Sequence, residues 1–265
     1  MATANPGAGT VLNISAARVI AILFVGLVAA EIFFVLADHF INVGRLTEQG
    51  PIRRFFNITR EDGLASWFAV TQTWMVGLTA GLVYLVVSGQ GGAHWRRMGW
   101  LILMFFLLYM AMDDGAAFHE RVGSSVKTML QGEDAESGSR AVGFFPSYAW
   151  QLVFLPIFGA FGLFMLWFLN RELARTVDKL LVLAVVGLLV MAVAADFFEG
   201  IDTTEHPLNL HGWIIATWGP SRAAVLHYSK SVEEFVEMLA MSILWLVFLR
   251  HLVRTAPTLE IRLRG

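Results

Sequence analysis

Residues 64–93 read LASWFAVTQTWMVGLTAGLVYLVVSGQGGA and contain no charged side chain. Residues 141–170, AVGFFPSYAWQLVFLPIFGAFGLFMLWFLN, are uncharged as well. A helix needs roughly 20 apolar residues to cross about 30 Å of hydrocarbon, so each stretch is long enough to span a bilayer unaided. These two stretches decide the fold, because they predict transmembrane helices rather than a soluble domain.

Four further apolar stretches are long enough to span if each tolerates a carboxylate. The six helices are expected at about 17–43, 64–90, 98–120, 147–171, 180–200 and 232–252, with outer loops at 44–63, 121–146 and 201–231. Transmembrane β-strands are shorter and alternate strictly between apolar and polar residues. We therefore expect an all-α polytopic bundle of six spans in a single membrane domain, residues 1–265. The first apolar stretch lacks a cleavage site, so we expect it to be retained as an anchor.

The composition excludes several classes of protein. The chain is 57% hydrophobic and 15% charged, with a mean hydropathy of +0.63, whereas a soluble domain is about 45–50% apolar and about 25% charged. It has no cysteine, which excludes a disulfide scaffold, thiolate metal sites, iron–sulfur clusters and cysteine nucleophiles. We expect membrane lipids around the chain and no nucleic-acid partner.

The basic residues concentrate on one side of the expected bundle. Ten of the 19 lysines and arginines lie there: Arg18, Arg96, Arg97, Arg171, Arg175, Lys179, Arg250, Arg254, Arg262 and Arg264. Lysine and arginine in short loops stay in the cytoplasm, so we expect both termini to be cytoplasmic. Only three of the 21 acidic residues, Glu172, Asp178 and Glu260, share that side. The other acids are expected on the extracytoplasmic side or in the outer halves of the helices.

Four carboxylates are expected at nearly one depth in the membrane. With a rise of 1.5 Å per residue from each cytoplasmic helix end, Glu31 and Glu237 lie about 20 Å along their helices, Asp113 about 22 Å and Asp196 about 24 Å. Each has a second acidic residue three, four or seven positions away, on the same helical face. In order along the chain these are Asp38, Glu120, Glu199 and Glu233. The pattern predicts a two-tier acidic funnel that opens toward the extracytoplasmic side.

Some of these acids also have a plainer interpretation. Ser231 and Glu234 fit a capping box that begins the last helix, and Asp113 can mark the end of a tilted helix at the interface. Glu31 and Glu237 fit such interpretations least, because apolar sequence flanks both. A charge in hydrocarbon costs several kcal/mol unless it is paired or faces a cavity. The sequence therefore points to a functional role for these two most directly.

Carboxylates at one depth repel each other, so we expect shared protons or a bound cation among them. Oxygen ligands suit calcium, magnesium or manganese, and an added imidazole shifts the preference toward iron, zinc or manganese. We predict a divalent metal ion, with iron, zinc, manganese and calcium left open. The candidate ligands are Glu31, Asp113, His119, Glu120, Asp196, Glu199, Glu233 and Glu237. Their spacing does not match the Glu-x-x-His repeats of di-iron bundles.

Two motifs resemble those of a known group of proteins. Residues 113–120, DDGAAFHE, and residues 233–238, EEFVEM, are similar to motifs in uncharacterised bacterial polytopic membrane proteins. Those proteins share an acidic pair followed by His-Glu and a late Glu-Glu-x-x-Glu-Met helix. The resemblance covers these two helices and carries no activity. It implies a bacterial inner membrane and a site shared by the two helices.

Three functions remain open from the sequence. The first is a metal-dependent membrane enzyme acting on a lipid or other apolar substrate. The second is a cation or proton transporter, although no charged residues continue from the carboxylates toward the cytoplasm. The third is an accessory subunit of a larger membrane complex or a homo-oligomer. The chain has no His-Glu-x-x-His motif, nucleotide-binding glycine pattern or serine elbow, so no catalytic residue is assigned.

Overall fold

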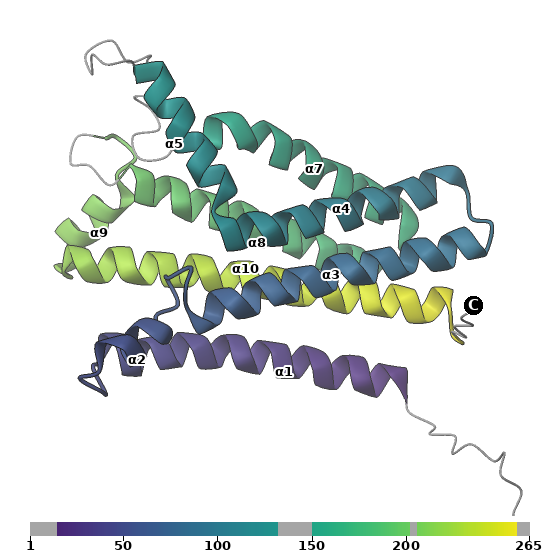
Figure 1. The fold of residues 1–265 in the computed structure, drawn as a ribbon, viewed down its shortest axis with the longest axis horizontal. Helices are drawn as coiled ribbons and strands as arrows, with labels where there is room; N and C mark the ends of the chain where they lie inside the picture. The colour runs from purple at the N-terminus through teal and green to yellow at the C-terminus, as the bar shows by residue number, and fades with distance from the viewer. Residues whose placement is uncertain (1–14, 132–149, 202–205, 259–265) are drawn as a thin grey trace, which may run out of the picture.

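The computed structural model describes residues 15–131, 150–201 and 206–258. Six helices in these ranges are long and apolar enough to cross a membrane, as Figure 1 shows. They are α1 (Ala16–Ala37) with its π-helical continuation η1 (Asp38–Val43), α3 (Leu64–Gly89), α4 (His94–Ala116), α7 (Trp150–Glu172), α8 (Thr176–Gly200) and α10 (Arg222–Thr255). The prediction of an all-α bundle with six spans is confirmed, and the protein is an integral membrane protein.

Three shorter helices lie together at one end of the bundle (Figure 1). They are α2 (Gly50–Phe55), α5 (Phe118–Gln131) and α9 (Leu210–Trp218). We call this end the loop end. The opposite end, here the terminal end, holds the start of α1, the α3–α4 and α7–α8 turns and the end of α10.

The last span differs most from its predicted bounds. It begins at Arg222 rather than at 232, and Ser221 caps it by accepting a hydrogen bond from the backbone N–H of Ala224. Ser231 lies inside the helix, where its hydroxyl donates to the carbonyl of His227 at 2.8 Å. The capping-box interpretation of Ser231 is therefore wrong. Much of the outer loop expected at 201–231 is helical, because α9 and the first turns of α10 lie within these residues.

The third span also differs from its prediction. Instead of continuing to residue 120, α4 ends at Ala116, because Ala117 takes a left-handed conformation with φ of 47°. A new helix, α5, then starts at Phe118 inside the expected loop 121–146. Residues 132–149, which include the rest of that loop and the expected start of the fourth span at 147, lie outside the described residues.

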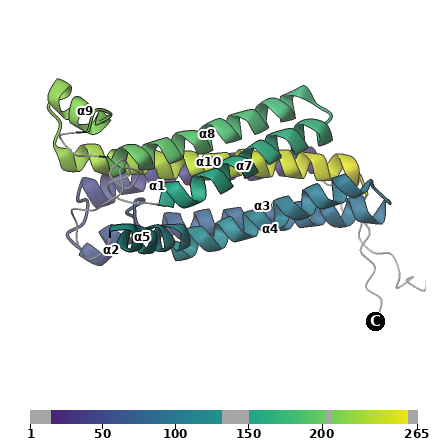
Figure 2. The ribbon, with the colours of Figure 1, turned by 90° about the horizontal axis from the view of Figure 1, so that it is seen from above.

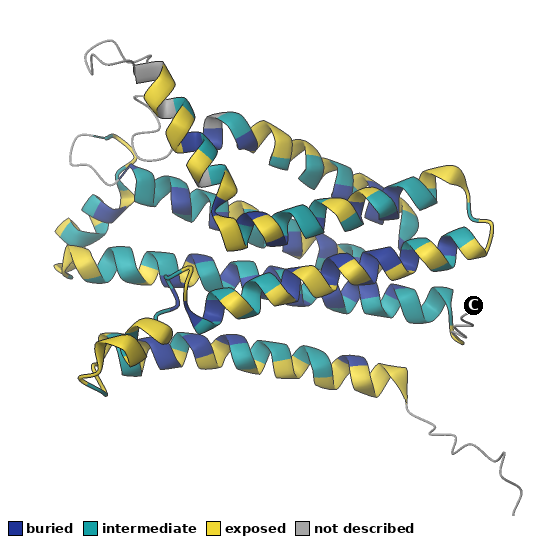
Figure 3. Cartoon of the chain, viewed as in Figure 1, coloured by how far each residue is buried: buried dark blue, intermediate teal, exposed yellow. Residues whose placement is uncertain are grey.

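An apolar core fills the terminal half of the bundle. Trp100 of α4 lies at its centre, with ring centroids 5.6 Å from Phe168 of α7 and 5.0 Å from Phe248 of α10. Gly99 lets α4 and α7 approach closely, since a Cβ there would lie 2.0 Å from Phe168 Cε2. Figure 3 shows many buried positions on α3 and α10, whose most apolar windows are 44% and 50% buried. The outward faces remain apolar, as exposed Leu163 illustrates, and suit contact with lipid.

Ion pairs close the terminal end below this core. Glu172 of α7 accepts hydrogen bonds from Arg96 of α4, and His251 of α10 lies 3.2 Å from the same carboxylate. Asp178 of α8 is fully buried and pairs with Arg254 at 2.6 Å and with Arg250 at 3.1 Å. These contacts fix α10 against its neighbours at one end. Figure 2 shows α10 running between α8 and α3 along the bundle.

Candidate functional site

The loop-end half of α10 carries buried or half-buried polar side chains on several of its faces. His227 and Ser231 interact with Asp38 of η1. Lys230 interacts with acids of its own helix and with Asp114 of α4. Because α10 packs against α1, α3 and α8, it is the element that these polar groups share.

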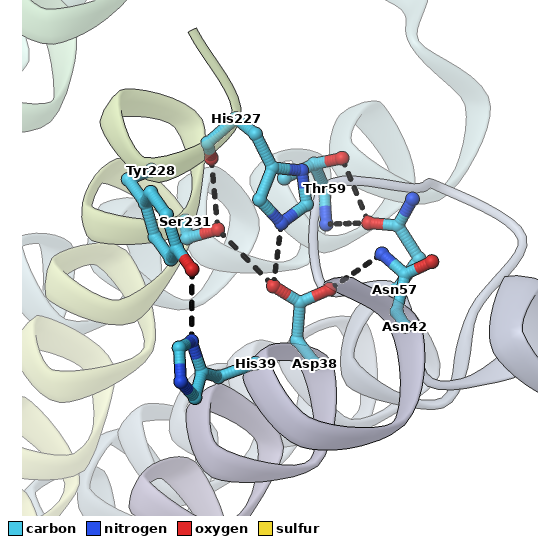
Figure 4. A network of polar contacts seen from close by, with 8 residues as sticks. All are labelled: Asp38, His39, Asn42, Asn57, Thr59, His227, Tyr228 and Ser231. Carbon is cyan, nitrogen blue, oxygen red and sulfur yellow. Dashed lines mark hydrogen bonds and ion pairs between the residues drawn. The ribbon is translucent and has the colours of Figure 1, made fainter. Parts of the chain in front are cut away.

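Asp38 is the centre of the first polar network (Figure 4). Its side chain is 1% exposed, with Oδ2 lying 2.7 Å from His227 Nε2 and Oδ1 accepting from Asn42 Nδ2 at 2.9 Å. The Ser231 hydroxyl lies 3.4 Å from Asp38 Oδ2 and donates to the His227 carbonyl. In a hydrolytic triad the histidine stands between serine and aspartate. Here the aspartate lies between the histidine and the serine, so the network is not such a triad. We call the contacts of Asp38 with His227 and Ser231 the clamp, because they hold η1 against α10.

The clamp coincides with the π-helical turn that begins at Asp38. Such turns are rare and occur often at functional sites. His39, the next residue, brings its Nδ1 within 2.8 Å of the Tyr228 hydroxyl (Figure 4). Two consecutive residues of η1 therefore contact α10, which ties the loop end of the first span to the last span.

A second Asp–His pair lies where α4 gives way to α5. Asp113 is fully buried, and its Oδ2 lies 2.7 Å from His119 Nδ1 while its Oδ1 accepts from the His119 backbone N–H at 2.8 Å. The left-handed Ala117 between them costs about 1–2 kcal/mol, and the two contacts hold that conformation. The His119 ring packs edge-on against Trp150, with centroids 4.8 Å apart. The structure therefore brings together Asp113 and His119, two of the candidate metal ligands.

Lys230 lies within a group of carboxylates that we call the Lys230 site. Its Nζ is 2.6 Å from Glu233 Oε1 and 3.7 Å from Glu234 Oε1. Asp114 of α4 and Glu237 interact with it electrostatically. Glu233 is 5% exposed, and its Oε2 has no hydrogen-bond partner among the described residues. The site thus combines one ammonium with four carboxyl groups from two spans.

Acids on neighbouring elements extend this negative field. Glu61, in the segment before α3, interacts electrostatically with Glu234 and Asp114. Asp196 of α8 interacts with Glu233, although its own Oδ2 accepts from Trp150 Nε1 at 2.9 Å and from Gln151 Nε2 at 2.6 Å.

Glu31 belongs to a separate network on α1, α3 and α10. It is fully buried, and its Oε1 accepts from Gln72 Nε2 at 3.0 Å and from Ser242 Oγ at 2.6 Å. Its Oε2 has no hydrogen-bond partner among the described residues. The structure therefore separates Glu31 from the Lys230 site, although the two share a similar predicted depth.

The loop between the first two long spans carries a carboxylate outside the membrane-spanning segments. Arg60 and Arg54 both donate hydrogen bonds to Asp62. These bonds lower the pKa of the Asp62 carboxyl to about 2. Asp62 is half exposed, so it provides a useful contrast to the buried acids.

The predicted metal ligands are thus distributed over several networks rather than one ring. In the part of the chain that the structure describes, no three histidine, aspartate or glutamate side chains form a group that could hold a metal ion as they stand. The backbone of Glu120 lies in α5, and its side chain lies outside that part. Glu199 lies in the last turn of α8.

Sequence reasoning missed the neutral donors of the site. Four neutral side chains each donate a hydrogen bond to a buried carboxylate: Gln72, Ser242, Asn42 and Gln151. A signal existed for Gln72, because it is an amide within the uncharged residues 64–93. Buried polar groups are nearly always hydrogen-bonded, so an isolated amide in a span predicts a buried partner.

Of three comparisons with known proteins, the comparison with protein-family models gives a match. Neither the curated proteins nor the solved structures contain a match. One family model, described as a domain of unknown function, DUF8692, matches residues 19–252. That match extends from α1 into the last turns of α10 and includes every acid of the networks described in this section. The chain therefore belongs to the DUF8692 family.

Proposed function

We propose that this membrane protein binds a divalent cation at the Lys230 site. The observation that carries the proposal is the position of the Lys230 ammonium, which lies against Glu233 and Glu234 and interacts with Glu237. Like charges that are withdrawn from water need a counter-charge. With its four carboxyl groups ionised, the site would carry more negative charge than one ammonium balances, and a divalent cation would balance it better.

Among the described residues, no three carboxyl or imidazole groups are arranged so that they could hold a metal ion. The Lys230 ammonium lies among the carboxyl groups of the site. The ammonium occupies the position between the carboxylates that a cation would take. Cation binding at this site therefore requires the Lys230 side chain to move away. The donors are carboxylate oxygens, which favour calcium, magnesium or manganese. An added imidazole would shift the preference toward iron or zinc, whereas the donors of this site are carboxylate oxygens.

A bound divalent cation would supply a Lewis acid for chemistry on a lipid or other apolar substrate. The apolar core of the terminal half, which includes Trp100 and Phe248, lies between the site and the terminal end. This core supports a binding or catalytic role over a path for ions. Basic residues such as Arg96 and Arg250 at the terminal end support a cytoplasmic position for that end in a bacterial inner membrane.

The test is cation-dependent stability of the purified protein in detergent. After chelation, calcium, magnesium, manganese and zinc are titrated separately while the melting temperature is followed, and bound metal is measured by elemental analysis. A ligand that binds only the folded state stabilises it by about 2.7 kcal/mol at 100 times its Kd. We expect saturable stabilisation by at least one cation.

Variants assign any such effect to the site. Glu233→Gln and Glu237→Gln should each weaken the apparent affinity by at least about tenfold, whereas Lys230→Met should strengthen it by removing the competing ammonium. Asp62→Asn, on an exposed loop, is the matched control and should leave the apparent cation affinity unchanged. The proposal is wrong if no cation binds, or if Asp62→Asn weakens binding as much as Glu233→Gln does.

A further inference from the structure

A pocket of about 520 Å³ lies between α8, α9 and α10 at the loop end. Ligand sites in proteins occupy about 300–1,000 Å³ and are mostly apolar. The walls of this pocket are largely apolar, with Met191 and Ala195 from α8, Ile214 from α9 and Val225 from α10. The pocket therefore has the size and the lining of a site for an apolar ligand.

The surrounding helices place the pocket at the loop end of the bundle, where the spans meet the headgroup level. Both α8 and α10 are spans, and α9 presents Trp213 and Trp218, which are 56% and 66% exposed. Tryptophan gathers at the boundary between lipid and water, so α9 lies at the headgroup level beside the pocket. Along α10 the lining runs from Ala224 to Val236, about 18 Å at 1.5 Å per residue. One leaflet of hydrocarbon is about 15 Å deep.

We propose that this pocket binds one acyl chain of a membrane lipid. An apolar cavity does not hold ordered water, since water needs two to four polar partners, and it takes up apolar ligands instead. In the hydrocarbon region the ligand that is present in excess is the lipid chain. The inner part of the lining, Val232 and Val236 of α10 with Met191 of α8, lies in the apolar part of these spans, where one chain can enter from the leaflet.

The polar groups in the lining connect the pocket to the Lys230 site. His211 Nε2 lies 3.1 Å from Ser229 Oγ, and both residues line the pocket together with Tyr228. Glu233 also lines it, while its Oε1 pairs with Lys230. A lipid in the pocket would therefore lie directly beside the proposed cation. The role of that lipid as substrate rests on the proposed function, whereas binding of the chain does not.

The test is photolabelling of the full-length protein in liposomes. One arm uses a phosphatidylcholine and the other a free fatty acid, each with a diazirine in the acyl chain, so that the two sources of a chain are distinguished. We expect labelling of peptides that contain Ala195 and Val225 in at least one arm. That labelling should exceed the labelling around Leu163, which is 70% exposed on α7 and reports general contact with lipid.

Variants that fill the pocket test whether the labelling comes from a chain bound inside it. Ala195→Trp should lower labelling of the pocket peptides by about tenfold, while Leu163→Trp should leave it unchanged. Ala224→Trp, at the outer part of the same pocket, serves if Ala195→Trp does not fold into a monodisperse species. The proposal is overturned if the pocket is labelled no more than α7, or if neither filling variant lowers the labelling.

The same variants separate this inference from the proposed cation site. Glu237→Gln, which does not line the pocket, should weaken stabilisation by the cation and retain labelling by the chain. Ala195→Trp should lose the labelling and retain stabilisation by the cation. If labelling occurs and no cation binds, the pocket stands and the proposed function fails.

Discussion

The clamp between η1 and α10 gives the sharpest prediction about stability. Replacing Asp38 with alanine removes the acceptor for His227 Nε2 and for Asn42 Nδ2, at 2.7 and 2.9 Å. A hydrogen bond to a charged group contributes about 1.5–3 kcal/mol, so losing both should cost about 3–6 kcal/mol. For a protein of this size about 1 kcal/mol shifts the melting temperature by roughly 2–4 °C. Asp38→Ala should therefore lower it by about 6–24 °C.

A double-mutant cycle isolates the Asp38–His227 contact. Asp38→Ala, His227→Ala and the double variant are unfolded in the same detergent, and the coupling should be about 2 kcal/mol, the contribution of one charge-assisted hydrogen bond. The matched control is the exposed ion pair of Arg54 and Asp62, whose cycle should show a much smaller coupling than the buried contact. If the effects of Asp38→Ala and His227→Ala simply add, the clamp is not an energetic contact and the reasoning fails.

Three further predictions concern other parts of the molecule. Gly99→Ala should cost about 1–3 kcal/mol through overpacking against α7, whereas Gly187→Ala, with nothing within 4 Å of the added Cβ, should be neutral; equal melting temperatures would contradict the packing. Asp178→Ala should destabilise the protein by about 3 kcal/mol, because it leaves two arginines of α10 without their buried partner; an unchanged denaturant midpoint would contradict this. Asp62 should titrate near pH 2 by carbon NMR, since its pKa is lowered to about 2. Its ion pairs therefore stabilise the fold above pH 4 and are lost as the pH falls through 2; a midpoint near 4 would show that they do not form.

Hydropathy predicts the six spans because hydrocarbon thickness is a strong constraint on uncharged sequence. It does not predict where a helix ends in water or at the interface. The segment from Arg222 to Ser231 is too polar to read as membrane-spanning, yet it continues α10 as a helix. In that segment His227, Lys230 and Ser231 are spaced three and four residues apart, a helical signal that hydropathy does not use. The start of the last span was therefore placed too late.

The position of a residue along its helix predicts the depth of its side chain in the membrane. It does not predict the direction in which the side chain points around the helix axis. Glu31 and Glu237 were expected at the same depth, and the sequence gives no rotation of either helix about its own axis. In the structure Glu31 contacts Gln72 and Ser242, while Glu237 interacts with Glu233 and Glu234. Tertiary packing decides such rotations. A common depth is therefore a necessary condition for a shared site and an insufficient one.

The two halves of the bundle are stabilised in different ways, and this difference bears on function. In the terminal half an apolar core around Trp100 and the ion pairs of Asp178 hold α10 in place. In the loop-end half, buried acids such as Asp38 and Glu233 rely on a few polar partners. Regions with few apolar contacts open locally at lower free energy than the whole protein. If the cation and the lipid chain bind as proposed, we expect the polar network of the loop end to rearrange beside its smaller apolar cluster while the terminal half stays folded.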